Sequence, residues 1–152
     1  MAGRPQPPMG PVRPGARTRL MVHVTGLGLW ISGGLWLIYH HFLRRPGEWG
    51  PDPNLLEPWW LRLHGAFAFL ALWTLGLMWG VHIARGWSSG RRRWTGSLFF
   101  AWLMMLSVTG YLLYYAGDDG AWAILSPAHW IAGLALPLAY AAHRWLKRRP
   151  GG

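Results

Sequence analysis

The stretch LHGAFAFLALWTLGLMWGVHIA, residues 63–84, contains no Asp, Glu, Lys or Arg. It is about 22 residues long, and about 20 residues suffice for a helix to cross the hydrocarbon core of a bilayer. The stretch also holds a histidine near each end, His64 and His82. An ionisable residue inside a span is costly and points to function. These residues therefore predict a transmembrane helix with functional groups at two depths.

Three more uncharged windows of similar length flank this stretch. We therefore predict an all-α fold, an integral membrane four-helix bundle at residues 18–147. The first window is longer than the core of a signal peptide and has no cleavage site after it, so we expect it to remain as a span. The predicted spans are about 20–43, 61–84, 94–116 and 120–143.

The segments outside the spans are rich in proline and glycine. Residues 1–17 also carry several arginines, and they are expected to be a disordered basic tail, because they cannot bury an apolar face. Residues 148–152 form a short second tail. The long loop between the first two spans is broken by prolines, and we expect it to fold as an irregular cap on the outer surface.

Composition excludes several classes of protein. The chain has 152 residues, of which 52% are hydrophobic and only 13% charged, about half the charged fraction of an average soluble domain. The absence of cysteine excludes thiol redox chemistry, cysteine-bound zinc, iron–sulfur clusters and covalently attached c-type haem. Histidine remains as the residue for metal chemistry.

The net charge of +10 is an orientation signal. The basic residues lie in clusters between the uncharged windows, so they do not form the continuous basic face that nucleic-acid binding requires. Twelve of the 15 lie in the N-terminal tail, the second loop and the C-terminal segment. Because loops rich in Lys and Arg stay in the cytoplasm, both termini are predicted to be cytoplasmic.

The seven histidines fall into two layers on this topology. The inner layer holds His23, His82 and His143, and the outer layer holds His40, His41, His64 and His129. The sequence separation between the layers is five helical turns in the first and second spans and nearly four in the fourth. Helical spacing therefore places one histidine of each layer on a common face of each of these three spans.

Two layers of histidines are what two stacked b-type haems require. Each haem needs two neutral imidazoles from two helices, buried in an apolar slot. Small residues should lie near the ligands so that the helices can approach the porphyrin. Candidates are Gly26, which is three residues after His23, Gly65, which follows His64, and Gly133, which is four residues after His129.

The other histidines and several tyrosines have two interpretations each. His40 and His41 lie at a span end and can be interfacial, or His41 can contact an external electron donor. His82 can likewise be interfacial or contact a quinone. Tyrosines in the third span can hydrogen-bond haem propionates, although packing is the simpler role; they are Tyr111, Tyr114 and Tyr115.

The histidine pattern resembles the di-haem membrane cytochrome b subunits of formate dehydrogenases and nickel-iron hydrogenases, which are cytochrome b561-like. That family takes one haem ligand from the first helix, one from the second and two from the fourth, with the spacing that separates His129 from His143 here. The resemblance implies that His64 and His129 hold the outer haem, and that His23 and His143 hold the inner one. Both pairs agree with the depths predicted from charge.

The chain is also similar to small bacterial four-helix membrane proteins with a His-Gly at the start of the second helix, here His64-Gly65, and a GYLLYY stretch in the third, here residues 110–115. These resemblances imply a multi-pass protein of the bacterial inner membrane. The chain is shorter than the formate dehydrogenase subunits and offers little surface for docking an iron–sulfur subunit.

The expected function is electron transfer across the membrane between a quinone pool and a redox partner, which is a protein or a larger dehydrogenase complex. The chain would hold two non-covalent b haems and act as a subunit of an oxidoreductase. One alternative is a non-haem transition-metal protein or transporter. Another is a membrane anchor or assembly factor without a cofactor, whose histidines need not share a face.

Overall fold

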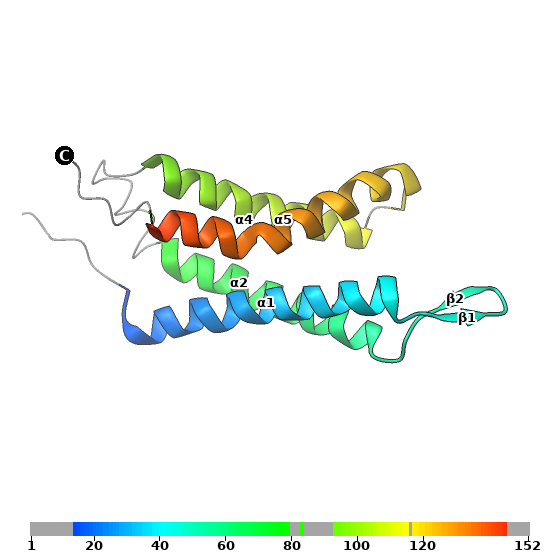
Figure 1. Ribbon diagram of the computed structural model, residues 1–152. Coiled ribbons are helices and arrows are strands. Elements are labelled where there is room, and N and C mark those ends of the chain that lie inside the picture. Colours follow the sequence, from blue (N-terminus) through cyan, green and yellow to red (C-terminus); the bar gives the residue numbers. More distant parts are fainter. Residues whose placement is uncertain (1–13, 80–82, 84–92, 116, 146–152) are drawn as a thin grey trace, which may run out of the picture.

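The computed structural model describes residues 14–79, 83, 93–115 and 117–145, and its architecture is four long helices with one short β-ribbon (Figure 1). All four helices are long and apolar enough to cross a membrane. The all-α prediction is confirmed for these elements, and their length and apolar composition suit a multi-pass membrane protein. The helices are α1 Ala16–Phe42, α2 Glu57–Met78, α4 Arg93–Tyr115 and α5 Asp119–Trp145.

Two of the helix starts have local signals. Helix α2 begins at Glu57-Pro58, which puts an acidic side chain and a proline in the first turn, where an unpaired N–H would otherwise remain. Helix α5 begins after Asp118, whose carboxylate accepts the backbone N–H of Ala121 at 2.8 Å. Such caps satisfy the free N–H groups of a first turn, and they fix the residue at which the helix begins.

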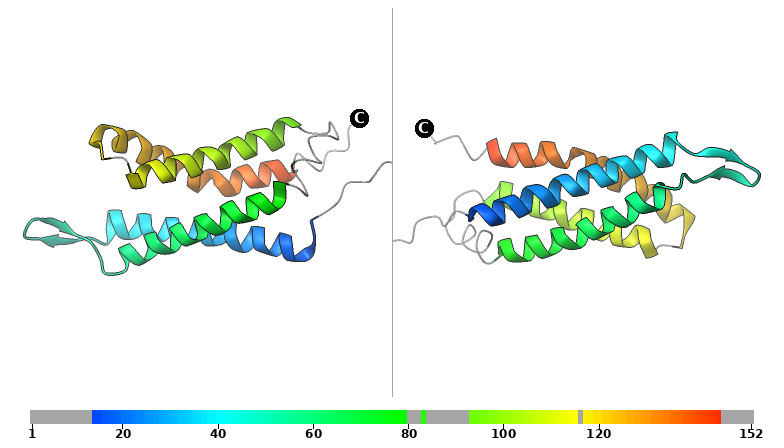
Figure 2. Two further views of the ribbon diagram at one scale, coloured as in Figure 1. Left: turned by 180° about the vertical axis from the view of Figure 1, so that it is seen from behind. Right: turned by 90° about the horizontal axis from the view of Figure 1, so that it is seen from below.

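The helices form two antiparallel hairpins. Helix α1 packs along α2, helix α4 packs along α5, and α1 also contacts α5. Figure 2 shows from two further sides that the four helices run along one long axis, with the α1–α2 loop and the α4–α5 turn at the same end. The start of α1 and the end of α5 lie together at the opposite end (Figure 1).

Burial in this bundle is the reverse of that in a soluble protein. The buried residues are mostly small or polar, and they include Thr25, Ser32 and Thr74. Large apolar side chains such as Phe69 and Leu138 are instead exposed, at 78% and 75%. Because lipid solvates apolar side chains while buried small residues let helices approach closely, this distribution suits helices surrounded by lipid.

The loop between α1 and α2 differs from the expected irregular cap. Strands β1 Arg45–Gly47 and β2 Gly50–Asp52 pair antiparallel around a two-residue turn. Gly50 has φ +123°, a conformation that residues with a side chain rarely adopt. This ribbon projects along the bundle axis, beyond the helix ends, and does not fold over them (Figures 1 and 2).

Two tryptophans tie α5 to its neighbours near a proline. Pro137 lies inside α5 and cannot donate a backbone hydrogen bond, which weakens the helix locally. The indole N–H of Trp30 in α1 donates to the carbonyl of Leu134 at 3.3 Å, and that of Trp102 in α4 donates to the carbonyl of Ala132 at 3.2 Å. The first of these bonds links the two hairpins, and the second joins α4 to α5 within one hairpin.

The contact between α1 and α2 leads to a first prediction. A Cβ added at Gly28 would overlap the ring of Phe67 in α2. Overpacking costs about 1–3 kcal/mol, and removal of a helix glycine returns about 0.5–1 kcal/mol. We therefore expect Gly28→Ala to lower the free energy of unfolding by about 1 kcal/mol, measured by thermal unfolding in detergent.

The control for this change is Gly34→Ala in the same helix. A Cβ at Gly34 would meet no described atom within 4 Å, so that variant should be as stable as the unchanged protein or slightly more so. Equal unfolding temperatures for the Gly28 and Gly34 variants would contradict the packing of α1 against Phe67.

Candidate functional site

His64 of α2 and His129 of α5 lie side by side in the space between the two hairpins. Their ring centroids are 6.3 Å apart and the ring planes are almost perpendicular, at 89°. Both side chains are partly buried. The sequence placed these two histidines in one layer on separate helices, and the fold brings their rings together.

The His64 ring is held by α1. Its Nδ1 lies 3.1 Å from the carbonyl oxygen of Leu29 and 3.3 Å from the hydroxyl of Ser32. Gly33 lies against the same ring, because a Cβ there would come within 3.0 Å of the imidazole Cε1. Ser32 is only 1% exposed, so this contact is among the most buried places in the described part of the chain.

The His129 ring is held by α4 in the same way. Its Nδ1 lies 2.9 Å from the hydroxyl of Thr109. The next residue, Gly110, lies against the same ring, because a Cβ there would come within 3.1 Å of the imidazole Cε1. Each histidine is therefore positioned by a hydroxyl and a glycine from the other helix of its own hairpin.

The hydrogen-bond partners assign the protons of both rings. The carbonyl of Leu29 beside His64 Nδ1 can only accept, so that nitrogen carries a hydrogen. The hydroxyl of Thr109 donates to the carbonyl of Met105 at 2.8 Å, so its oxygen accepts from His129 Nδ1. Each ring then has an Nε2 lone pair for a ligand. The hydrogen bonds that hold the two rings, to Leu29, Ser32 and Thr109, are made by Nδ1.

The separation of the two ring centres is compatible with two imidazoles that bind one metal ion from opposite sides. An imidazole nitrogen binds a transition metal at about 2 Å, and the ring centre lies about 1 Å behind it, so two imidazoles on opposite sides of one ion have centres about 6 Å apart. The observed separation is 6.3 Å. A ligating histidine also donates its other ring N–H to a carbonyl or similar acceptor, as both rings do here. The donor set is the one that a bis-histidine haem iron needs.

In the described part of the chain, no group of three or more His, Asp or Glu side chains lies close enough together to hold a metal ion. A haem iron needs only two protein ligands, because the porphyrin supplies four nitrogens. His64 and His129 are two such candidate ligands, and they come from separate helices.

The inner histidines have aromatic neighbours. His23 Nε2 lies 3.3 Å from the hydroxyl of Tyr140, and His23 Nδ1 lies 2.6 Å from the carbonyl of Arg19. His143 stacks on Phe99, with ring centroids 5.3 Å apart and planes 11° apart. Tyr140 contacts both His23 and Phe99, so it lies between the two sides of the predicted inner site.

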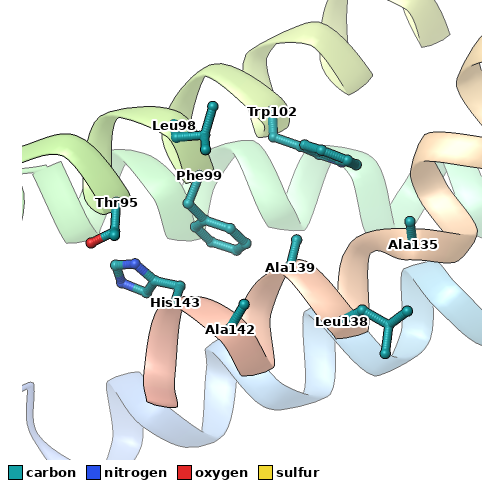
Figure 3. Close-up of a pocket in the computed structure, with 9 residues that line it drawn as sticks. All are labelled: Thr95, Leu98, Phe99, Trp102, Ala135, Leu138, Ala139, Ala142 and His143. Atoms are coloured by element: carbon teal, nitrogen blue, oxygen red, sulfur yellow. The ribbon is translucent and has the colours of Figure 1, made fainter. Parts of the chain in front are cut away.

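His143 also lines a cavity between α4 and α5. The cavity has a volume of about 390 Å³ and its walls are almost entirely apolar. Figure 3 shows the His143 ring beside Phe99 and Thr95 at one end of it, with Ala139 and Ala142 along α5. Phe99 lines this cavity and also contacts Tyr140 of α5.

The predicted glycines lie apart from protein neighbours. A Cβ at Gly26 or Gly65 would meet no described atom within 4 Å, and one at Gly133 would meet Leu106 at 4.0 Å. Their contact with a haem stays a prediction. His82 lies outside the described residues, so its assignment as a quinone contact or an interfacial residue also stays a prediction.

A polar cluster at the end of the bundle that carries the β-ribbon (Figure 1) involves His40. The buried carboxylate of Glu57 accepts hydrogen bonds from Arg44 Nη2 at 2.7 Å and Arg44 Nε at 3.3 Å. His40 Nδ1 lies 2.7 Å from the same carboxylate, and its ring stacks on Trp36. The hydrogen bond to Glu57 raises the pKa of Arg44 above its usual range. His40 is thus part of an ion-pair cluster that joins α1 to α2, and its neighbour His41 is exposed.

The tyrosines of the third predicted span lie at the exposed end of α4. Tyr111 and Tyr114 each contact Tyr115, at centroid distances of 4.6 and 5.5 Å. All three side chains are largely exposed. Their contact with haem propionates stays a prediction.

The residues that hold the rings of His64 and His129 were not predicted from the sequence; they are Ser32, Gly33, Thr109 and Gly110. A signal for them exists in the sequence. Residues 29–33 and 106–110 share the pattern Leu-x-x-(Ser or Thr)-Gly, and its three defined positions lie on one helix face. Which histidine each face meets depends on helix pairing, which the pattern does not encode.

Comparison of the chain with protein-family models, with curated proteins and with solved structures found no match.

Proposed function

We propose that the protein is a b-type cytochrome of the membrane, which passes electrons between a quinone pool and a redox partner. The observation that supports this most directly is the arrangement of His64 and His129. Their rings have the spacing that one bound iron requires, and their Nδ1 hydrogens are already donated. In the anchor alternative the two histidines need not share a face, and their proximity weighs against it.

The residues of the chain have three roles in this proposal. His64 and His129 bind the iron of the outer haem through Nε2. The hydroxyls and carbonyls of α1 and α4 orient the two rings. The apolar helix faces keep water away and hold the site at low dielectric. The haem supplies the one-electron chemistry, while the protein supplies ligands, orientation and tuning.

The inner haem is proposed on the predicted layering and the family resemblance, with His23 and His143 as ligands. This assignment requires one rearrangement. The Tyr140 hydroxyl lies at His23 Nε2, and it would have to leave that nitrogen before His23 could bind iron. The outer pair needs no such change among its described neighbours.

The proposed setting is the bacterial inner membrane, with both ends of the chain in the cytoplasm. The basic segments of the sequence support this orientation. The His64 and His129 pair would then lie toward the outer surface. A protein of this kind acts as an electron-transfer subunit with a partner protein or a larger dehydrogenase complex.

The absorption spectrum of the protein purified in mild detergent from a haem-replete host tests the proposal. We expect non-covalent haem b, at two per chain, with the reducible Soret and α bands of low-spin bis-histidine iron. Haem content is measured as the pyridine complex after extraction.

Other outcomes of this purification would overturn the cytochrome assignment. A protein without reducible bands that carries a stoichiometric transition metal would favour the non-haem metal alternative. A protein with neither haem nor metal would favour the anchor or assembly factor. One haem per chain instead of two would keep the cytochrome assignment and contradict one of the two proposed haem sites.

A further inference from the structure

The two outer histidines are held by two copies of the same local structure. In each hairpin the first helix carries a Leu-x-x-(Ser or Thr)-Gly segment, residues 29–33 in α1 and 106–110 in α4. The second helix carries the histidine, His64 or His129. We use the term hydroxyl–glycine cradle for the Leu, the Ser or Thr and the Gly at the three defined positions of each segment, together with the histidine that they contact.

The hydrogen bonds of the two cradles correspond atom by atom. The Ser32 hydroxyl lies 2.6 Å from the carbonyl of Gly28, four residues earlier, and 3.2 Å from that of Leu29, three residues earlier. The Thr109 hydroxyl makes the same two contacts, at 2.8 Å to Met105 and 3.2 Å to Leu106. Each hydroxyl therefore donates its proton to a backbone carbonyl of its own helix.

A hydroxyl that already donates its proton to a carbonyl can act toward the histidine only as a hydrogen-bond acceptor. Ser32 and Thr109 therefore accept from Nδ1–H, and at His64 the carbonyl of Leu29 accepts from the same nitrogen. These acceptors favour the tautomer that leaves Nε2 without a hydrogen. The glycine one residue later lets the ring lie close to the helix, because a Cβ there would come within 3.0 Å of the ring carbon at Gly33 and 3.1 Å at Gly110.

We propose that Ser32 and Thr109 are positioning residues that set the reduction potential of the outer haem and hold its two axial imidazole planes perpendicular. This inference rests on the proposed function. A hydrogen bond accepted from Nδ1–H makes the imidazole a stronger donor to iron, which favours the ferric state and lowers the potential. The perpendicular planes follow from the 89° angle between the two cradled rings.

The experiment compares Ser32→Ala, Thr109→Val and the double variant with the unchanged haem-loaded protein. The control is Ser107→Ala, because the Ser107 hydroxyl bonds the carbonyl of Leu103 on α4 in the same manner. Redox titration at the α band measures the midpoint potential. Electron paramagnetic resonance of the oxidised protein measures the ring angle, since perpendicular axial planes give a low-spin ferric signal with a large maximum g value.

We expect the double variant to retain the outer haem and to titrate at a higher potential. A tenfold loss of ferric preference corresponds to a rise of about 59 mV for a one-electron couple. Each single variant should shift less, and Ser107→Ala should not shift. The large maximum g value should decrease in the double variant, because the rings lose the contact that orients them.

A glycine pair gives a second readout that does not depend on the hydroxyls. Gly33→Ala would press on the His64 ring, whereas Gly34→Ala, one residue later, meets nothing within 4 Å. The first should change the maximum g value and the second should leave it unchanged. Circular dichroism on each variant verifies that the helices have formed.

The outcomes separate the two proposals. An unchanged protein that binds no haem contradicts the proposed function itself. A protein that binds haem, with potentials and g values in the double variant and Gly33→Ala identical to those of the controls, leaves the cytochrome in place and overturns the positioning role of Ser32 and Thr109. A shift in potential or g value confined to the cradle variants supports it.

Discussion

Replacing His64 or His129 by alanine should remove the outer haem and leave the inner haem in place. The haem content should fall from two per chain to one, because the two rings are 6.3 Å apart and serve the same iron in our proposal. Either replacement should give the same loss, since one remaining imidazole cannot hold low-spin bis-histidine iron. Haem extraction and the reduced-minus-oxidised spectrum measure the change.

The matched control for these variants is His41→Ala. His41 belongs to the same predicted layer, but its side chain is exposed, so this change should leave both haems bound. Loss of both haems from a variant with normal helix content, or loss of neither, would count against the pairing of His64 with His129. Different losses for the two single variants would also count against it.

Replacing Glu57 by glutamine should destabilise the junction of α1 and α2. The Glu57 side chain is 7% exposed and accepts bonds from both Arg44 and His40. A hydrogen bond to a charged group contributes about 1.5–3 kcal/mol. The Arg44 side chain is 32% exposed, so solvent screens part of this interaction, and we expect a total loss of about 2 kcal/mol.

A loss of this size should lower the unfolding temperature by about 4–8 °C in a chain of this length. Thermal unfolding in detergent, followed by circular dichroism, measures it. Glu48→Gln is the control, because Glu48 lies exposed at the tip of the β-ribbon and its loss should have little effect. If the two glutamine variants unfold at the same temperature, the Glu57 cluster contributes nothing to stability.

The helices were the most predictable part of the fold. Described helices α1, α4 and α5 cover the predicted windows 20–43, 94–116 and 120–143 to within a few residues. An uncharged run of that length has few alternatives to a helix, because every backbone group must be hydrogen-bonded within the bilayer. The β-ribbon was not predicted, because its two strands are short and each contains a proline, a residue that does not favour strands.

The depth of the histidines along their helices was predictable from the sequence, but the contacts that their rings make were not. Charge and helical spacing placed His64 and His129 at one depth, and the fold brings their rings together. The same reasoning placed His23 and His143 in one layer, and the family resemblance implied that they form a pair. The structure shows Tyr140 at the ring nitrogen of His23. Depth along a helix follows from residue number, whereas the rotation of a helix about its axis depends on the packing of its neighbours.

The sequence by itself determined the number of long apolar helices, and it predicted two layers of histidine. Transfer of a residue between water and lipid depends mainly on that residue, so hydropathy and charge can be read one position at a time. Only the tertiary structure decided that the two Leu-x-x-(Ser or Thr)-Gly segments face His64 and His129. Hydrogen bonds between helices depend on which faces meet, and that choice is made by the packing of the four helices together.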